Sequence, residues 1–314
     1  MIHMRHALVA GIALATFQTF TASAQNARSF VSRNGSDAAA CTLAAPCKSF
    51  AGAHARTNAK GVINCLDPAE YGALVITKSI TINCEAARAS IEAPFNGYGI
   101  QLSTAPSDRV TISGVDIEGA LFSNGIALAG SPLGELHVSD VSINGCAIGI
   151  LFAPTNISQL VVKDSRISGN ASEGLFVSPQ TTGAANVHLS RVRLENNGVG
   201  LHAYGFGSAI GVNINMQDGL VAGNANFGVQ ANTGSGKAPV AISITSTQIS
   251  GNFGPGLEAD AAGGSALIRV NASMITANAS AIGASGGGHV RSLGDNHVGA
   301  NGGGEIFTGR DSLK

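Results

Sequence analysis

Apolar and polar residues alternate in short runs along most of this chain of 314 residues. Val110-x-Ile112, Leu136-x-Val138 and Ile268-x-Val270 are typical runs. Alternation over so few residues predicts β-strands, because a helix needs an apolar stripe of about ten or more residues at a 3.6-residue period. The runs do not follow the LxxLxL spacing of leucine-rich repeats, which excludes that class of repeat protein.

The strands belong to a unit that repeats along the chain. A Gly or Asn corner returns every 24 to 28 residues through most of the sequence, and the last interval is 18 residues. We place the corners at Gly119, Gly145, Gly169, Asn196, Gly223, Gly251, Ala277 and Asp295. A fixed period of this size indicates a solenoid, in which each unit buries its apolar side on its neighbours. Three short strands per unit predict an all-β fold, a right-handed parallel β-helix of about eight to nine coils.

One position per unit carries a recurring polar residue. It is the residue directly after the corner: Asn170, Asn197, Asn224, Asn252 and Asn278. Such a column is predicted to form a ladder of side-chain amides that satisfies backbone groups between coils. Cys146 occupies the same position one unit earlier, so we expect a buried, unpaired thiol there.

Residues 1–24 are predicted to be a secretory signal peptide. Basic Arg5 and His6 precede an apolar run that is too short to span a bilayer, and Ala22-Ser23-Ala24 matches a cleavage site. The sequence therefore predicts export to a periplasm or out of the cell, and no membrane span in the mature chain.

The rest of the chain is expected to be one elongated domain in three segments. Residues 25–60 form an N-terminal cap, whose helix opens after Pro46 and runs to about Ala59. Such a helix would cover the unpaired edge of the first coil. Residues 61–304 form the β-helix, and residues 305–314 form a C-terminal tail.

Composition narrows the range of partners. The formal net charge is −1, and only 12% of the residues are charged. This balance argues against nucleic acid and anionic membrane surfaces as partners. The 42 glycines and the apolar fraction of 44% suit a β-structure with tight corners rather than a disordered chain.

All five cysteines lie after the predicted signal peptide, where disulfides persist. The sequence alone leaves several pairings open. We favour Cys41 with Cys47 across one short loop, and Cys65 with Cys84 near the ends of two neighbouring strand segments.

Aligning the coils on their corners brings charged side chains into columns on one face. These residues are Asp116, Asp140, Asp164, Arg166, Arg191 and Arg193, with Glu195 nearby. Carboxylates of this kind can hold Ca²⁺, and arginine can bind or help deprotonate a uronate, whereas a hydrolase needs two carboxylates at a characteristic separation. Asp140, Asp164, Arg166 and Arg191 are therefore candidate catalytic residues, and Asp116, Arg193 and Glu195 are candidate substrate-binding residues. The competing interpretation is a set of cross-strand ion pairs that only stabilise the surface.

A second face has apolar residues at positions that point outward. Leu151, Phe176 and His202 occupy one outward column, and Tyr204 and Phe206 follow in the next loop. We take Phe176, His202 and Tyr204 as candidate substrate-binding residues, since aromatic rings stack on sugars or on a protein partner. A loop folded over them is the alternative.

The entry region carries a specific resemblance. Phe30 to Asp37 (FVSRNGSD), Cys41 to Phe50 (CTLAAPCKSF), Leu66 to Tyr71 (LDPAEY) and Ile76 to Ile82 (ITKSITI) resemble the entry of the pectin-lyase-like superfamily, most closely secreted bacterial members of unassigned function. The resemblance implies a β-helix and favours a polysaccharide ligand. A chain without Trp lacks the Trp-Asp-His motif of pectate lyases, and Asp67-Pro68-Ala69-Glu70 lacks the His of the similar motif in alginate epimerases.

Three classes of function therefore stay open. The leading hypothesis is an exported β-helix that presents a long face to an extracellular or cell-wall polysaccharide. The second is a lyase or hydrolase that acts on acidic glycans, with Ca²⁺ as a possible cofactor of the lyase. The third is a surface or adhesin-like structural protein.

Overall fold

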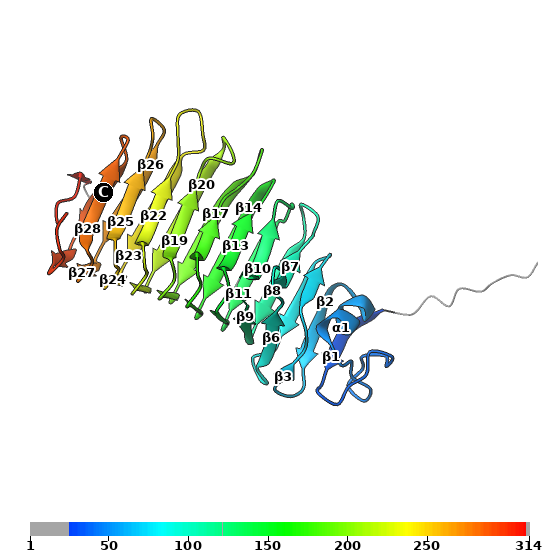
Figure 1. Cartoon of the computed structure of the whole chain (residues 1–314). Coiled ribbons are helices and arrows are strands. Elements are labelled where there is room, and N and C mark those ends of the chain that lie inside the picture. The colour runs from blue at the N-terminus through cyan, green and yellow to red at the C-terminus, as the bar shows by residue number, and fades with distance from the viewer. Residues whose placement is uncertain (1–24, 121, 312–314) are drawn as a thin grey trace, which may run out of the picture.

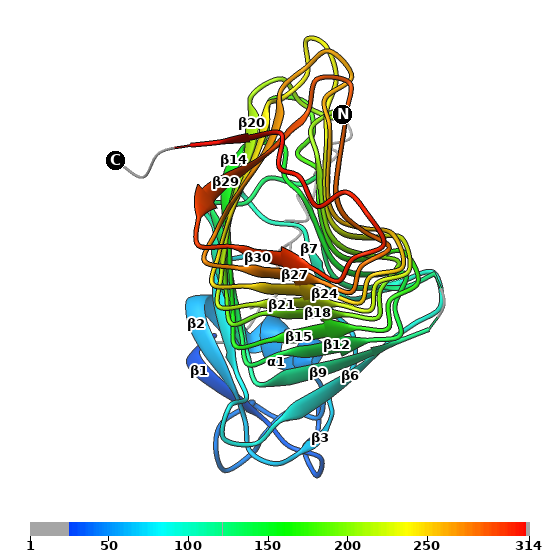
Figure 2. The ribbon, with the colours of Figure 1, turned by 90° about the vertical axis from the view of Figure 1, so that its left-hand side faces the viewer.

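The computed structural model describes residues 25–120 and 122–311, so the predicted signal peptide lies outside the described residues. The chain winds into a parallel β-helix, with a short helix at its N-terminal end (Figure 1). Seen along the axis, successive coils stack in register around one interior (Figure 2). The all-β solenoid and the N-terminal helix predicted from the sequence are both confirmed.

Three parallel sheets run along the solenoid, and each coil contributes one strand to each. Sheet A has 12 strands: β1 (Asn26–Val31), β2 (Thr57–Cys65), β5 (Ile80–Asn83), β8 (Arg109–Ser113), β11 (Glu135–Ser139), β14 (Ile157–Lys163), β17 (Ala184–Ser190), β20 (Gly211–Gln217), β23 (Val240–Thr245), β26 (Ala266–Asn271), β29 (His289–Gly294) and β31 (Gly309–Arg310).

Sheet B has 10 strands and follows sheet A in each coil after a sharp corner. They are β3 (Ala69–Glu70), β6 (Ala89–Ala93), β9 (Val115–Gly119), β12 (Ser142–Asn144), β15 (Arg166–Ser168), β18 (Arg193–Glu195), β21 (Leu220–Ala222), β24 (Gln248–Ser250), β27 (Met274–Thr276) and β30 (His297–Gly299).

Sheet C has 9 strands, which corresponds to nine complete coils. They are β4 (Leu74–Ile76), β7 (Tyr98–Leu102), β10 (Asn124–Ala129), β13 (Ile148–Ala153), β16 (Glu173–Val177), β19 (Val199–Tyr204), β22 (Phe227–Asn232), β25 (Pro255–Asp260) and β28 (Ser280–Ser285). Loops of varied length return the chain from sheet C to sheet A.

The core is a set of aliphatic columns. Ile112, Val138 and Val162 stack from coil to coil in sheet A, and Ile117 and Ile143 stack in sheet B. All five are fully or almost fully buried. Alternation places every second side chain of a strand inside the solenoid. A single coil would leave these aliphatic side chains exposed, and stacking on the neighbouring coils buries them.

The predicted asparagine ladder is confirmed and is longer than predicted. The backbone N–H and the side-chain Nδ2 of each ladder residue donate to Oδ1 of the Asn one coil further along, over 2.7–3.2 Å. It continues from Asn278 to Asn301, where Oε1 of Glu305 accepts the last backbone N–H over 3.0 Å. Glu305 thus supplies the acceptor that a further coil would have supplied.

The last predicted corner was wrong. Thr276 and Gly299 pair in sheet B, so the residues that follow them, Ala277 and Ala300, occupy equivalent positions in neighbouring coils. Ala277 and Ala300 both have positive φ. Asp295, with φ 49°, instead turns the chain from sheet A into sheet B. The last sheet B corner is therefore Ala300, so the interval after Ala277 is 23 residues and not 18.

The helix of the N-terminal cap is shorter than predicted, and more of the cap consists of β-strand. Helix α1 spans Phe50–Arg56, and its N-cap Ser49 accepts a hydrogen bond from the backbone N–H of Gly52. The chain turns into β2 at Thr57, whose extended backbone ends the helix before Ala59. Phe50 packs on Tyr71 of the first coil with ring centroids 5.2 Å apart, which seals the end of the core.

Both predicted disulfides are present, and the fifth cysteine is free. Cys41 is bonded to Cys47, and Cys65 is bonded to Cys84. Cys146 is buried at the start of the ladder, where its backbone N–H donates to Oδ1 of Asn170. No helix in the described residues is long and apolar enough to cross a membrane.

Cys146 is expected to be inert in the native protein. Burial raises the pKa of its thiol to about 11, so almost no thiolate forms at neutral or mildly alkaline pH. At pH 8 an aromatic disulfide reagent should label it only after denaturant is added. Rapid labelling of the folded protein would contradict this placement.

Candidate functional site

The predicted columns of charged residues are real and lie along the edge between sheets A and B. Asp140, Asp164 and Arg191 each stand first in the two-residue corner between a sheet A strand and a sheet B strand, with φ values of 50°, 49° and 53°. Asp tolerates this left-handed region better than most residues because its short side chain bonds locally. Two residues further on, Asp116, Ser142, Arg166 and Arg193 follow one another across sheet B. We call this region the A/B edge.

Arg88, which the sequence analysis missed, links the first two carboxylates of the A/B edge. Its Nε lies 3.0 Å from Oδ2 of Asp116, and its Nη1 lies 2.8 Å from Oδ1 of Asp140. It comes directly before Ala89, which pairs with Val115. Arg88 therefore occupies the same corner column one coil before Gly114, and the sequence pattern hid it because its own coil has no corner glycine.

The remaining arginines are held in the same way. Nε and Nη2 of Arg191 donate to both carboxylate oxygens of Asp164, over 2.5 and 2.8 Å. This bond lowers the pKa of Asp164, which keeps its carboxylate ionised. Arg193 donates to Glu195 through two nitrogens, and Nε of Arg166 donates to the same carboxylate over 2.8 Å. The bonds to both arginines lower the pKa of Glu195 against the opposing effect of burial.

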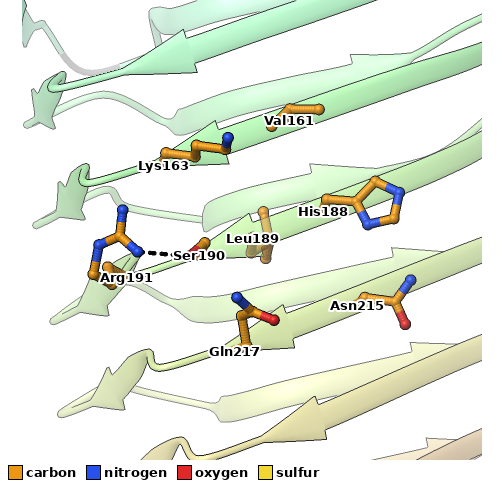
Figure 3. A pocket seen from close by; sticks show the side chains of 8 residues that line it. All are labelled: Val161, Lys163, His188, Leu189, Ser190, Arg191, Asn215 and Gln217. Carbon is orange, nitrogen blue, oxygen red and sulfur yellow. Dashed lines mark hydrogen bonds between the residues drawn. The ribbon is translucent and has the colours of Figure 1, made fainter.

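Two depressions meet at Arg191. One, of about 370 Å³, lies on sheet A, and Figure 3 shows Lys163, His188, Asn215 and Gln217 on its neighbouring strands. The other, of about 390 Å³, lies on the sheet B side of the A/B edge. Its charged lining consists of Arg88, Asp140, Asp164, Arg166, Arg191 and Arg193. Together they form a surface that runs over neighbouring coils.

This surface has an excess of positive charge. The two linings contain five cationic side chains, those of Lys163, Arg88, Arg166, Arg191 and Arg193, and two carboxylates, those of Asp140 and Asp164. Asp116 and Glu195 pair with three of these arginines from beside the linings, so the net excess is one positive charge. Lys163 is close enough to help lower the pKa of Asp164, yet it has no carboxylate oxygen within 4 Å among the described residues. The lining therefore suits an anionic ligand.

The arrangement does not fit the Ca²⁺ that the sequence allowed for a lyase. In residues 25–120 and 122–311, no three His, Cys, Asp or Glu side chains are placed to share a metal ion. Guanidinium groups already occupy one oxygen of Asp140 and both oxygens of Asp164. We derive no chemical step through calcium.

The predicted aromatic residues lie on a different face. Phe176, His202 and Tyr204 project outward from sheet C, in strands β16 and β19. Their ring centroids lie 4.9 to 5.9 Å apart. The structure thus divides the predicted site residues into two groups, one at the A/B edge and one on sheet C, and it does not bring them together.

The chain is a β-solenoid with a charged outward edge, and its sequence matches a known protein family. Residues 62–241 match the family described as the right-handed β-helix region. The match covers more than half of the chain, and the protein belongs to this family. No curated protein matches the sequence significantly.

Two solved structures are similar to this chain. One is the pectate lyase Pel9A, with a TM-score of 0.60 and 14% identity over 92% of this chain and 79% of that chain. The other is an alginate lyase from Paenibacillus sp. str. FPU-7, with a TM-score of 0.49 and 13% identity over 88% of this chain and 97% of that chain. At these identities the likeness concerns the fold alone.

Proposed function

We propose that this protein binds an acidic polysaccharide along the A/B edge. The observation that carries the proposal is the pair of depressions that meet at Arg191 and are lined by five cationic side chains. The similarity of the fold to that of a pectate lyase supports a polysaccharide as the ligand. The two disulfides support an exported location, where such a polymer is met.

The ion pairs prepare the arginines for this role. A guanidinium has five N–H donors in a fixed fork, and Glu195 engages Arg166 through Nε only. The two Nη groups of Arg166 therefore stay available to a ligand carboxylate, while Glu195 fixes where they point. In this arrangement Asp116, Asp164 and Glu195 act as positioning residues for the cations that bind the ligand.

Catalysis by Asp140, Asp164, Arg166 and Arg191 stays a prediction. A hydrolase requires one carboxyl that holds a proton to donate to the leaving group. The lowered pKa of Asp164 works against that role, since its carboxylate is ionised at neutral pH. The geometry therefore supports binding better than glycoside hydrolysis.

Binding is tested by calorimetric titration of the protein with polygalacturonate oligomers. We expect saturable binding that weakens as salt is added, because screening reduces attraction between exposed charges. Lys163→Gln and Arg166→Gln should each weaken binding at least fivefold, since charge-assisted hydrogen bonds contribute about 1.5–3 kcal/mol each. Absorbance of an unsaturated uronate product, followed in the same samples, tests the lyase alternative, and we expect no product.

Matched controls separate the site from general charge effects. Arg33 is 56% exposed and pairs with Asp67 in the cap, much as Arg166 is 53% exposed and pairs with Glu195. Arg33→Gln and Lys237→Gln should leave the affinity unchanged. Equal losses in the controls, or unaltered affinity in the Lys163 and Arg166 variants, would overturn the proposal.

A further inference from the structure

A band of four aromatic rings crosses the outward face of sheet C. It consists of Phe176, His202, Tyr204 and Phe206, which we call the aromatic band. Neighbouring ring centroids lie 4.9 Å apart for Phe176 and His202, 5.7 Å for His202 and Tyr204, and 5.0 Å for Tyr204 and Phe206. All four side chains are partly exposed. The band therefore forms one partly exposed aromatic surface that crosses two coils.

Neighbouring residues contact two of the four rings, those of His202 and Phe206. Nδ1 of His202 lies 3.4 Å from Oε1 of Glu173, and its Nε2 lies 3.1 Å from Oδ1 of Asn232. Phe206 lies over Gly234, where a Cβ would approach the ring to 2.7 Å. Only a glycine leaves the ring this space. These contacts orient the rings of His202 and Phe206.

Polar residues continue the band towards the C-terminal coils. His202 pairs in register with Gln230, which pairs in turn with Glu258. In the same way, Tyr204 pairs with Asn232, which pairs with Asp260. The Glu258 carboxylate reaches over the next coil, where a Cβ on Gly283 would lie 1.7 Å from Oε2. Partial burial and the charge of Asp260 both raise the pKa of Glu258. Two carboxyl groups therefore lie on the same face as the rings, two strands further along sheet C, and one of them is half-buried.

The charge on this face is opposite in sign to that of the A/B edge. The nine strands of sheet C, all of them within the described residues, contain no Lys or Arg. Their acidic residues are Glu173, Glu258 and Asp260. A uronate would be repelled here. A protonated amine would be attracted both by the carboxylates and by the aromatic faces.

From this geometry we propose that the aromatic band and the carboxyl groups further along the same face form a second glycan site, selective for a chain that carries free amino groups, such as β-1,4-linked glucosamine. The rings pack against the C–H faces of the sugars, and Gln230 and Asn232 are placed to hydrogen-bond their hydroxyls. The site uses none of the residues of the A/B edge. Its ligand class differs from the acidic polymer proposed above.

Titration with a glucosamine hexamer at pH 6 tests this site. The wild-type protein should bind the hexamer, and Tyr204→Ala should weaken binding at least tenfold. Glu258→Gln keeps the shape of the side chain and should weaken binding at least threefold. Tyr98, also partly exposed on sheet C but several coils away, provides the matched control. Tyr98→Ala should bind as the wild type does.

The same titration separates this site from the A/B edge. The N-acetylated hexamer should bind at least tenfold more weakly, and polygalacturonate oligomers should not compete. Equal affinity for the N-acetylated hexamer would overturn the selectivity for amines. Unchanged affinity in Tyr204→Ala and Glu258→Gln, with the unfolding transitions of both variants close to that of the wild type, would overturn the site itself.

Discussion

Replacing Asn224 by alanine is expected to destabilise the solenoid by about 3–6 kcal/mol, because each buried polar group left without a partner costs about 1–3 kcal/mol. Oδ1 of Asn224 accepts from the backbone and side chain of Asn197, and its Nδ2 donates to Oδ1 of Asn252 and to the carbonyl of Leu194. The side chain is fully buried, so water cannot replace it. Urea unfolding followed by circular dichroism measures the effect.

Asn213 provides the matched control for this experiment. It is exposed on sheet A, and its Nδ2 lies 3.4 Å from Oδ1 of Asn186, a contact open to solvent. Asn213→Ala should change the free energy of unfolding by no more than about 0.5 kcal/mol, as is usual for surface substitutions. Similar losses in both variants would show that the ladder is not a main source of stability.

The second large effect is expected at the glycines that begin the strands of sheet C. Gly228 faces the ladder, and a Cβ there would lie 2.5 Å from the carbonyl oxygen of Gly256 and 2.9 Å from Nδ2 of Asn252. Gly228→Ala should therefore cost about 1–3 kcal/mol through overpacking, with a further loss where the ladder is pushed apart.

Gly303 is the corresponding control, because a Cβ there would meet no atom within 4 Å. Gly303→Ala should unfold at nearly the same urea concentration as the wild type. If Gly228→Ala also unfolded at the urea concentration of the wild type, that result would contradict the close approach of neighbouring coils at the ladder.

The architecture was predictable from the sequence because each coil repeats the same local rules. Alternation in runs such as Leu136-x-Val138 predicted the strands, and the Asn after each corner predicted the ladder. Local spacing also sufficed for the disulfide between Cys41 and Cys47. In each case the decisive contacts join equivalent positions of adjacent coils, and the period of the sequence displays those positions directly.

The ends of the repeat were harder to predict because a repeat rule fails where the repeat is irregular. Arg88 was missed since its coil lacks a corner glycine. The 18-residue interval to Asp295 hides Asn301, although the pair Ala300-Asn301 repeats the pair Ala277-Asn278.

The site also depends on geometry that spacing does not encode. A column of charges on the sequence does not reveal which arginine donates to which carboxylate, nor that Glu195 serves two arginines. Nor does it reveal that Lys163 lines a depression on sheet A beside the A/B edge. These features follow from side-chain directions across neighbouring coils.

A crystal structure of the protein with a galacturonate oligomer tests the central claim most directly. The account predicts that the oligomer lies along the A/B edge, with ligand carboxylate oxygens within hydrogen-bonding distance of Arg166 and Lys163. An oligomer bound on the aromatic band of sheet C, or no bound oligomer at saturating concentration, would contradict it.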